Sequence, residues 1–301
     1  MAFTMNSIPP CDGKTFLVTG ANSGLGYETC LALARRGANV KMACRSPERA
    51  AAAVERIREA VPDAKIEVLS LDLGDLASVA RCAEQVAGTG GLDVLINNAG
   101  IMAVPPGRTV DGFELQFGTN HLGHFALTLR LLPTLRDRVV TVTSTVARIG
   151  SMPFDNLHGE KSYNRWAAYA RSKLANQLFT LELARRLEAA GDPRRALSAH
   201  PGYAATELQK SSADQSGSWF EGAIMALGNF SIAMSAANGA LPQLLAATMP
   251  DAPNGALYGP WIFGSWGAPA LETPPPQARD AEVAARLWEL SETATGVRFV
   301  R

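Results

Sequence analysis

The N-terminal part of the chain contains an apolar run, a glycine-rich turn and a helical stretch in immediate succession. Residues 15–19 (TFLVT) are rich in strand-forming side chains, glycines follow at positions 20, 24 and 26, and residues 24–36 have helical composition. Glycines between a strand and a helix permit a tight turn and let the backbone approach a pyrophosphate at the helix N-terminus. This succession predicts a dinucleotide-binding strand–turn–helix unit. A glycine-rich turn without a ligand is the alternative.

The rest of the chain continues this alternation. Strands are expected at residues 15–19, 39–43, 66–70, 93–97, 138–143 and 196–200, and helices near residues 24–36, 47–61, 75–87, 110–136, 162–190, 238–248 and 279–293. The pattern predicts an α/β fold, a doubly wound parallel sheet of about seven strands (Rossmann type) with helices on both faces. We expect one domain over residues 1–301, with a substrate lid at about 203–237 and a C-terminal extension at about 250–301.

Composition and charge indicate which partners and which cellular location to expect. Lys+Arg and Asp+Glu both number 28, so nothing suggests a nucleic-acid partner. The four cysteines form no C-x-x-C pair, and residues 1–14 lack the apolar core of a signal peptide, so we expect reduced thiols and a cytoplasmic location. Residues 222–250 carry no charge, but Gly, Asn and Pro interrupt them. They are interpreted as an apolar lid plus a buried helix, and membrane contact is the less favoured alternative.

Polar side chains follow two of the expected strands. Asn97 and Asn98 come at the end of the strand at 93–97, and Ser144 follows the strand at 138–143. Ligands bind at the carboxyl ends of strands in an open parallel sheet, so these residues are candidates for a site. Each could instead be an ordinary turn or cap residue.

Tyr169 and Lys173 are separated by one helical turn and therefore share a helix face. Free Tyr titrates near ~10, and lowering that pKa to about 7 needs roughly 4 kcal/mol. One positive charge ~4 Å away at an effective dielectric of ~20 supplies about that much. The pair predicts a proton donor that works near neutral pH, although such a pair alone also occurs by chance.

An ordered set of motifs extends over nearly the whole chain. Its members are Thr19-Gly20, Asn98-Ala99-Gly100, Asn120, Ser144, Tyr169, Lys173 and Pro201-Gly202. The set resembles the short-chain dehydrogenase/reductase family. Residues 111–125 (DGFELQFGTNHLGHF) and His200-Pro201-Gly202 further resemble the branch that holds retinol dehydrogenases, WW-domain oxidoreductase and protochlorophyllide reductase.

This resemblance implies a role for each catalytic candidate. Tyr169 would exchange a proton with the substrate oxygen, and Lys173 would lower the Tyr169 pKa and bind the nicotinamide ribose. Ser144 would polarise the carbonyl, and Asn120 would hold a water that links Lys173 to solvent. The residues that the resemblance places at the cofactor are Gly20, Asn22, Ser23, Gly24, Leu25, Gly26, Arg45, Asp72, Leu73, Asn98, Ala99, Gly100, Tyr169, Lys173, Pro201, Gly202 and Thr206.

The cofactor preference rests on the end of the second strand. Cys44 stands where NAD-specific dehydrogenases carry an acid for the ribose hydroxyl, and Arg45 follows it. An Arg can bind a 2′-phosphate bidentately, so NADP(H) is predicted, with NAD(H) possible. Arg45 as a plain surface charge is the alternative. Asp72 is expected at the adenine, or as a helix cap.

Three other side chains of the motif region have non-catalytic interpretations. His121 and His124 flank Asn120 without a carboxylate, so no metal is expected and both should pack in the core. Tyr163 is expected to be structural. Asn120 itself could be only a kink or capping residue.

The chain departs from many family members in two places. The stretch from Ile149 to Arg165 is long and should lie near the pocket mouth. With this stretch, a monomer and a homodimer are equally expected as the oligomeric state. Trp261, Phe263 and Trp266 in the extension could fold over the cleft or belong to the core. The lid candidates indicate a medium-sized apolar carbonyl or alcohol substrate, and they are Tyr203, Trp219, Phe220, Ile224, Met225 and Leu227.

The favoured function is an NADP(H)-dependent oxidoreductase that interconverts a carbonyl and an alcohol. A catalytically silent NADP(H)-binding regulator and an isomerase or lyase that uses bound NAD transiently are alternatives. A tetrapyrrole double-bond reductase is a narrower one.

Overall fold

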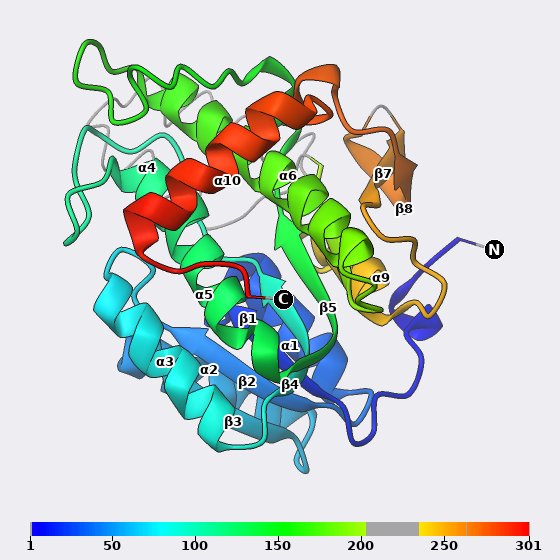
Figure 1. The fold of residues 1–301 in the computed structure, drawn as a ribbon. Coiled ribbons are helices and arrows are strands. Elements are labelled where there is room, and N and C mark those ends of the chain that lie inside the picture. Colours follow the sequence, from blue (N-terminus) through cyan, green and yellow to red (C-terminus); the bar gives the residue numbers. More distant parts are fainter. Residues whose placement is uncertain (1, 203–234, 263, 301) are drawn as a thin grey trace, which may run out of the picture.

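The structure is a computed structural model that describes residues 2–202, 235–262 and 264–300. In this part of the chain eight strands form one sheet, in the order β3-β2-β1-β4-β5-β6-β7-β8 (Figure 1). The strands β1 to β7 pair in parallel, and β8 pairs antiparallel with β7. Their bounds are Thr15–Thr19 (β1), Asn39–Cys44 (β2), Lys65–Ser70 (β3), Leu92–Asn97 (β4), Leu135–Val142 (β5), Arg195–Ala199 (β6), Leu257–Ile262 (β7) and Trp266–Glu272 (β8).

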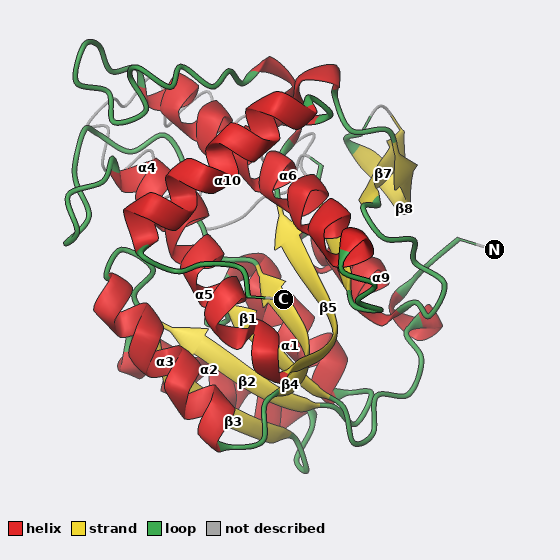
Figure 2. Ribbon diagram, viewed as in Figure 1, coloured by secondary structure: helices red, strands yellow, loops and turns green. Residues whose placement is uncertain are grey.

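Helices cover both faces of this sheet (Figure 2). Phe16 and Val18 of β1 pack with α1, α2 and α9, whereas Leu17 points to the opposite face and packs with α3, α5 and α6. The doubly wound fold expected from the sequence is therefore confirmed. The helix bounds are Gly24–Ala34 (α1), Pro47–Ala60 (α2), Leu76–Gly88 (α3), Leu115–Phe117 (α4), Gly123–Leu131 (α5), Arg165–Ala189 (α6), Ala236–Thr248 (α9) and Ala281–Thr295 (α10).

The strand order reverses between β1 and β4, the place where ligands bind in doubly wound sheets. The chain leaves the carboxyl end of β1 at Gly20 and that of β4 at Asn98, so both turns lie at this switch point. The helix α6 is started by Asn164, whose side chain accepts hydrogen bonds from the backbone of Trp166 and Ala167.

The helix expected over residues 110–136 is interrupted. It consists of α4, a π-helix over Gly118–Leu122, α5 and a 3-10 turn at Leu132–Thr134. The helical stretch begins at Glu114, whose carboxylate accepts from the Gln116 and Phe117 amides. It ends at the turn that contains Pro133, and β5 then starts at Leu135, three residues before the expected strand.

The region beyond residue 250 contributes two strands and a helix. The strands β7 and β8 extend the sheet, and α10 packs along α6 (Figure 1). Trp261 is 66% exposed, so its interpretation as a core residue is wrong. Phe263 and the lid candidates between residues 203 and 227 lie outside the described residues.

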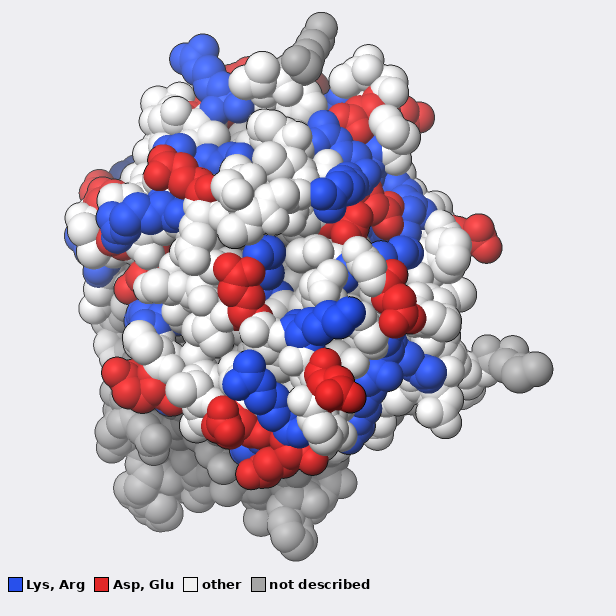
Figure 3. All heavy atoms as spheres, turned by 90° about the horizontal axis from the view of Figure 1, so that it is seen from below, with Lys and Arg blue, Asp and Glu red and all other residues white. Residues whose placement is uncertain are grey.

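The described surface carries both signs of charge. On the face drawn in Figure 3, Lys and Arg side chains alternate with Asp and Glu side chains. Within residues 2–202, 235–262 and 264–300, no helix has the length and apolar character needed to span a membrane.

Candidate active site

The glycine turn after β1 lies directly against the turn after β4. Gly20 has a φ of +65°, which a residue without a side chain adopts at little cost, and a Cβ on it would lie 2.9 Å from the Ala99 Cα. A Cβ on Gly26 would overlap the Gly20 carbonyl oxygen. The sequence-predicted residues Asn22, Ser23, Gly24 and Leu25 lie half-buried between these two glycines. Both turns can approach closely because these positions are glycine.

Thr19 holds the second turn in place. Its hydroxyl oxygen accepts hydrogen bonds from the amides of Asn98 and Ala99, both at 2.9 Å. The Asn98 side chain in turn donates to the Thr19 carbonyl at 2.8 Å. Gly100 follows, and a Cβ there would lie 3.3 Å from the Lys173 Nζ. The cofactor and catalytic candidates of these segments are therefore neighbours.

Two hydrogen bonds connect the end of β5 to α6 at the catalytic candidate Lys173. Lys173 Nζ donates to the Val142 carbonyl at 3.1 Å, and the Thr143 hydroxyl donates to the Lys173 carbonyl at 2.8 Å. Ser144 caps the 3-10 helix Thr145–Ile149 and is hydrogen-bonded to Tyr169. The structure thus brings Ser144, Tyr169 and Lys173 together at the carboxyl end of the sheet.

Asn120 is fully buried in the π-helix, where Gly123 N donates to the Gly118 carbonyl. A π-turn redirects side chains and is frequent at functional sites. The Asn120 side-chain amide pairs with both backbone groups of Ile101, accepting from its N–H at 2.8 Å and donating to its carbonyl at 2.9 Å. The Asn120 side chain therefore fixes the chain just beyond Gly100.

Burial dominates the electrostatics of the Tyr–Lys pair. Tyr169 is 7% exposed, and burial raises its pKa to about 12 although the Ser144 hydrogen bond acts in the opposite direction. Lys173 is 4% exposed, and burial lowers its pKa to about 8. Its Nζ lies 5.9 Å from the centre of the Tyr169 ring. Without a bound dinucleotide the pKa of Tyr169 therefore lies above its ordinary value, and the lowering to about 7 that was expected from Lys173 together with a cationic nicotinamide is not seen for the phenol alone.

The end of β2 presents a neutral thiol followed by a cation. Cys44 is buried against the glycine turn, and burial raises its pKa to about 11 although the Ala21 and Asn22 amides hydrogen-bond to it. Arg45 directly follows β2 and is exposed. No carboxylate therefore occupies the Cys44 position.

Asp72 and Leu73 lie at the end of β3. The Asp72 carboxylate accepts from the Gly74 amide at 2.8 Å, whereas Asp75 caps α3 by accepting from Ala77 N. The interpretation of Asp72 as the helix cap is therefore wrong. Leu73 is buried, and its carbonyl leaves no room for a side chain at Gly123.

Pro201 and Gly202 follow β6, and the preceding His200 contacts Glu272, which with Arg148 was missed by the sequence analysis. Gly202 N donates to His200 Nδ1 at 3.2 Å, and His200 Nε2 lies 3.1 Å from the Glu272 carboxylate. Arg148 donates to the other oxygen of Glu272 at 2.8 Å. Burial favours the protonated acid, but hydrogen bonds and charge from His200 and Arg148 lower the pKa of Glu272. No local signal identifies Glu272, because its strand β8 was not recognised. Thr206 lies outside the described residues.

His121 and His124 are both 1% exposed, which confirms that they pack in the core. Tyr163 donates to the Val104 carbonyl at 2.9 Å and accepts from Gln116 Nε2 at 3.0 Å. The long stretch before α6 is therefore attached to the chain after β4, and Tyr163 anchors it.

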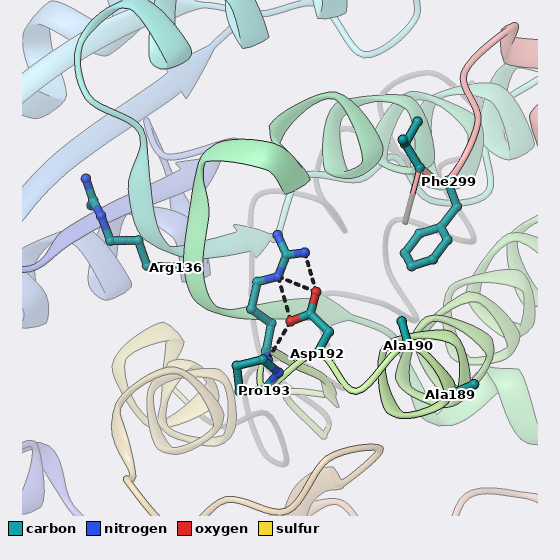
Figure 4. A pocket seen from close by; sticks show the side chains of 8 residues that line it. Arg136, Ala189, Ala190, Asp192, Pro193 and Phe299 are labelled. Carbon is teal, nitrogen blue, oxygen red and sulfur yellow. Dashed lines mark hydrogen bonds and ion pairs between the residues drawn. The ribbon is translucent and has the colours of Figure 1, made fainter.

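A separate cavity of about 630 Å³ lies at the amino ends of β5 and β6 (Figure 4). Arg136, Asp192, Arg194 and Phe299 line it, and Arg194 is paired with Asp192. None of the sequence-predicted site residues contributes to this cavity. It lies at the end of the sheet opposite to the catalytic candidates.

A family profile described as short chain dehydrogenase matches residues 14–217. The chain belongs to this family. Human retinol dehydrogenase 13 is 39% identical over 291 residues, which cover 95% of this chain and 85% of that protein. Mouse retinol dehydrogenase 14 is 40% identical over 305 residues, covering 95% and 86%. A crystal structure of an uncharacterized protein from Mycobacterium Paratuberculosis matches with a TM-score of 0.85 and 45% identity over 100% of both chains.

These similarities confirm the resemblance to the retinol dehydrogenase-like branch. This short-chain dehydrogenase is accordingly an oxidoreductase of a family that uses NAD(H) or NADP(H). The gathered Ser144, Tyr169 and Lys173 lie where the family fold carries its ligands, at the carboxyl edge of the sheet.

Proposed function

We propose that this short-chain dehydrogenase is an NADP(H)-dependent enzyme that interconverts a carbonyl and a primary or secondary alcohol on a medium-sized apolar substrate. The observation that carries the proposal is the cluster of Ser144, Tyr169 and Lys173 beside the turn that ends in Gly100. A phenol, a hydroxyl and an ammonium in one buried site provide a proton, a hydrogen-bond donor and a positive charge around one reacting oxygen.

Tyr169 acts as the acid when a carbonyl is reduced. Its O–H bond breaks as the proton moves to the substrate oxygen, and the phenolate left behind is stabilised by Lys173 and Ser144. In the oxidative direction the phenolate takes the proton back. The nicotinamide, when bound, supplies the hydride to the carbonyl carbon or accepts it from the alcohol carbon. Burial favours the protonated form of Tyr169, which is the form that a reduction requires.

The residues that would hold the dinucleotide follow the switch point of the sheet. The turn from Gly20 to Gly26 would hold a pyrophosphate at the N-terminus of α1, since it connects β1 to α1 and glycines let a backbone approach a phosphate closely. The turn from Asn98 to Gly100 and the Pro201-Gly202 segment would hold the nicotinamide end of the dinucleotide. Asp72 and Leu73 would bind the adenine end, and Lys173 would bind the ribose hydroxyls.

The preference for NADP(H) is supported by Cys44 and Arg45. A neutral, buried thiol neither repels a 2′-phosphate nor accepts hydrogen bonds from a ribose as a carboxylate does. The exposed guanidinium of Arg45 can bind the phosphate bidentately.

The proposal also covers the substrate class, the cellular location and the oligomeric state. The names of the relatives suggest a long apolar alcohol or aldehyde such as a retinoid as the first compound to test. Four buried free cysteines fit a cytoplasmic protein. The protein would act as a monomer or a homodimer.

Oxidation of NADPH and of NADH, measured with a panel of apolar aldehydes and ketones that includes retinal, tests the proposal. We expect turnover with NADPH exceeding that with NADH. Tight NADPH binding without turnover on any compound would favour a regulator. Co-purifying NAD with no net redox change would favour an isomerase or lyase, and bound pigment would favour a tetrapyrrole reductase.

A further inference from the structure

A buried histidine, His124, contacts two of the segments that form the proposed cofactor and catalytic site, the end of β1 and the π-helix. His124 lies in α5, four residues after Asn120, and is 1% exposed. Its Nε2 lies 2.9 Å from the Thr19 hydroxyl at the end of β1. Its Nδ1 lies 2.9 Å from the main-chain carbonyl of Asn120 in the π-helix. One side chain therefore touches both the strand that leads into the glycine turn and the segment that carries a catalytic candidate.

The hydrogen bonds around Thr19 determine where the proton of His124 is. The Thr19 hydroxyl oxygen already accepts two hydrogen bonds, from the Asn98 and Ala99 amides. A hydroxyl has two acceptor lone pairs and one proton, so the Thr19 proton is left to donate to His124 Nε2. Nε2 must then be unprotonated, and Nδ1 carries the ring proton and donates to the Asn120 carbonyl. This is the neutral Nδ1–H tautomer.

We infer that His124 is a positioning residue of the proposed reaction: as the Nδ1–H tautomer it fixes the Thr19 hydroxyl, and through it the Asn98-Ala99 turn, relative to Asn120. The inference rests on the proposed dinucleotide site. Without the acceptor at Nε2, the Thr19 hydroxyl is free to rotate and the two amides lose a fixed partner. Without the donor at Nδ1, the Asn120 carbonyl in the π-helix loses its hydrogen bond from the His124 side chain.

His121 supplies a matched comparison one turn earlier in the same region. It is also 1% exposed, and its Nε2 lies 2.9 Å from the Ser291 hydroxyl, which already donates to the Leu287 carbonyl. Ser291 must therefore accept, and His121 is the opposite tautomer, Nε2–H. It packs among Phe117, Phe125 and Phe179 and touches none of the cofactor turns described above. Its loss should affect packing but not dinucleotide binding.

Four variants separate positioning from packing. His124→Phe removes both hydrogen bonds, whereas the amide of His124→Gln offers one acceptor and one donor at a separation similar to that of the ring nitrogens. His124→Asn is shorter and keeps only the contact with the Asn120 carbonyl. His121→Phe is the packing control. The measurement is the NADPH dissociation constant by titration calorimetry on folded protein, with thermal unfolding recorded in parallel.

We expect His124→Phe to weaken NADPH binding about tenfold or more, as for the loss of a fixed hydrogen bond, and His124→Gln to stay within about threefold of wild type. His124→Asn should be intermediate, and His121→Phe should bind normally even if it unfolds at lower temperature. Should His124→Phe fail to fold, the contrast between His124→Gln and His124→Asn carries the same information. Equal NADPH affinity in all His124 variants overturns the inference. A wild-type protein that does not bind NADPH instead contradicts the proposed function.

The tautomers provide a second readout that does not depend on activity. Long-range proton–nitrogen NMR spectra of ¹⁵N-histidine-labelled protein at neutral pH should show His124 protonated at Nδ1 and His121 at Nε2. His124 protonated at Nε2 would contradict the hydrogen-bond assignment on which the inference depends.

Discussion

Lys173 Nζ lies 5.9 Å from the centre of the Tyr169 ring, and both side chains are more than nine-tenths buried. Burial acts on the two groups in opposite directions, raising the pKa of the phenol to about 12 and lowering that of the ammonium to about 8. The phenol therefore keeps its proton, and the charge on Lys173 is maintained against a desolvation penalty. Both properties suit a site that transfers a proton to substrate once a dinucleotide is bound.

The buried charge of Lys173 should cost stability. At pH 7 a pKa lowered from 10.5 to about 8 corresponds to about 3 kcal/mol, so Lys173→Met should raise the melting temperature while reducing turnover at least ~100-fold. Below pH 8 the ammonium is charged in both the folded and unfolded states and the penalty is complete. Between pH 8 and 10.5 only the unfolded state keeps the proton on Lys173, so the stability that Lys173→Met gains over wild type should become smaller. Urea unfolding of both proteins at pH 7 and pH 10 measures this, and a variant less stable at pH 7 would refute it.

Arg45→Ala should weaken NADPH binding tenfold or more and leave NADH binding unchanged, because the guanidinium would contact only the 2′-phosphate. Arg58→Ala is the matched control, since Arg58 is an exposed cation in the last turn of α2. Dissociation constants for both dinucleotides decide the matter. Parallel losses for NADPH and NADH would remove Arg45 as the source of the preference.

Gly26→Ala should abolish dinucleotide binding and lower stability by a few kcal/mol, because its Cβ would overlap the Gly20 carbonyl and press on the Asn98 side chain. Gly88→Ala offers the comparison, as Gly88 ends α3 with open space around it and should tolerate Ala with unchanged or slightly higher stability. Chemical unfolding together with NADPH titration tests the pair. Normal binding by Gly26→Ala would show that the close approach of the two turns is not needed.

Acid should destabilise the protein through His121 and His124. Burial lowers the pKa of His121 to about 3 and that of His124 to about 4, so the folded protein resists protonation that the unfolded chain accepts below about 6.5. The contribution of the two neutral histidines to stability is fully present above pH 6.5. As the pH decreases toward 4, the free energy of unfolding should fall by about 1.4 kcal/mol per pH unit for each histidine. His121→Gln should reduce this slope, measured by urea unfolding between pH 7 and 4.5. An unchanged slope would show that His121 is not the source.

The fold could be predicted where the strands are short, apolar and bounded by glycine or polar residues. The strand β1 coincides with its prediction, and β2 and β3 differ from theirs by one residue at one end. The strands β7 and β8 were not recognised, because Gly and Pro inside LYGPWI and WGAPALE hide the strand signal. The sequence analysis offered a helix kink at Asn120 only as an alternative, and no local pattern indicated the π-helix over Gly118–Leu122.

The sequence predicted which residues form the candidate site better than it predicted their pKa values. The spacing of Tyr169 and Lys173 placed both on one face of α6, but their pKa values depend on burial that no local pattern reveals. His124 carried a usable signal, because it lies four residues after Asn120 and so on the same helix face. The link from His200 to Glu272 carried none, since it joins β6 to a strand 72 residues away.

The central claim is that Tyr169 provides the proton for hydride transfer. Single-turnover oxidation of NADPH with the best carbonyl substrate, followed by stopped-flow absorbance for wild type and Tyr169→Phe, tests it most directly. We predict that Tyr169→Phe binds NADPH within about threefold of wild type and oxidises it at least ~100-fold more slowly. A Tyr169→Phe protein that retains more than about a tenth of the wild-type rate would contradict the account.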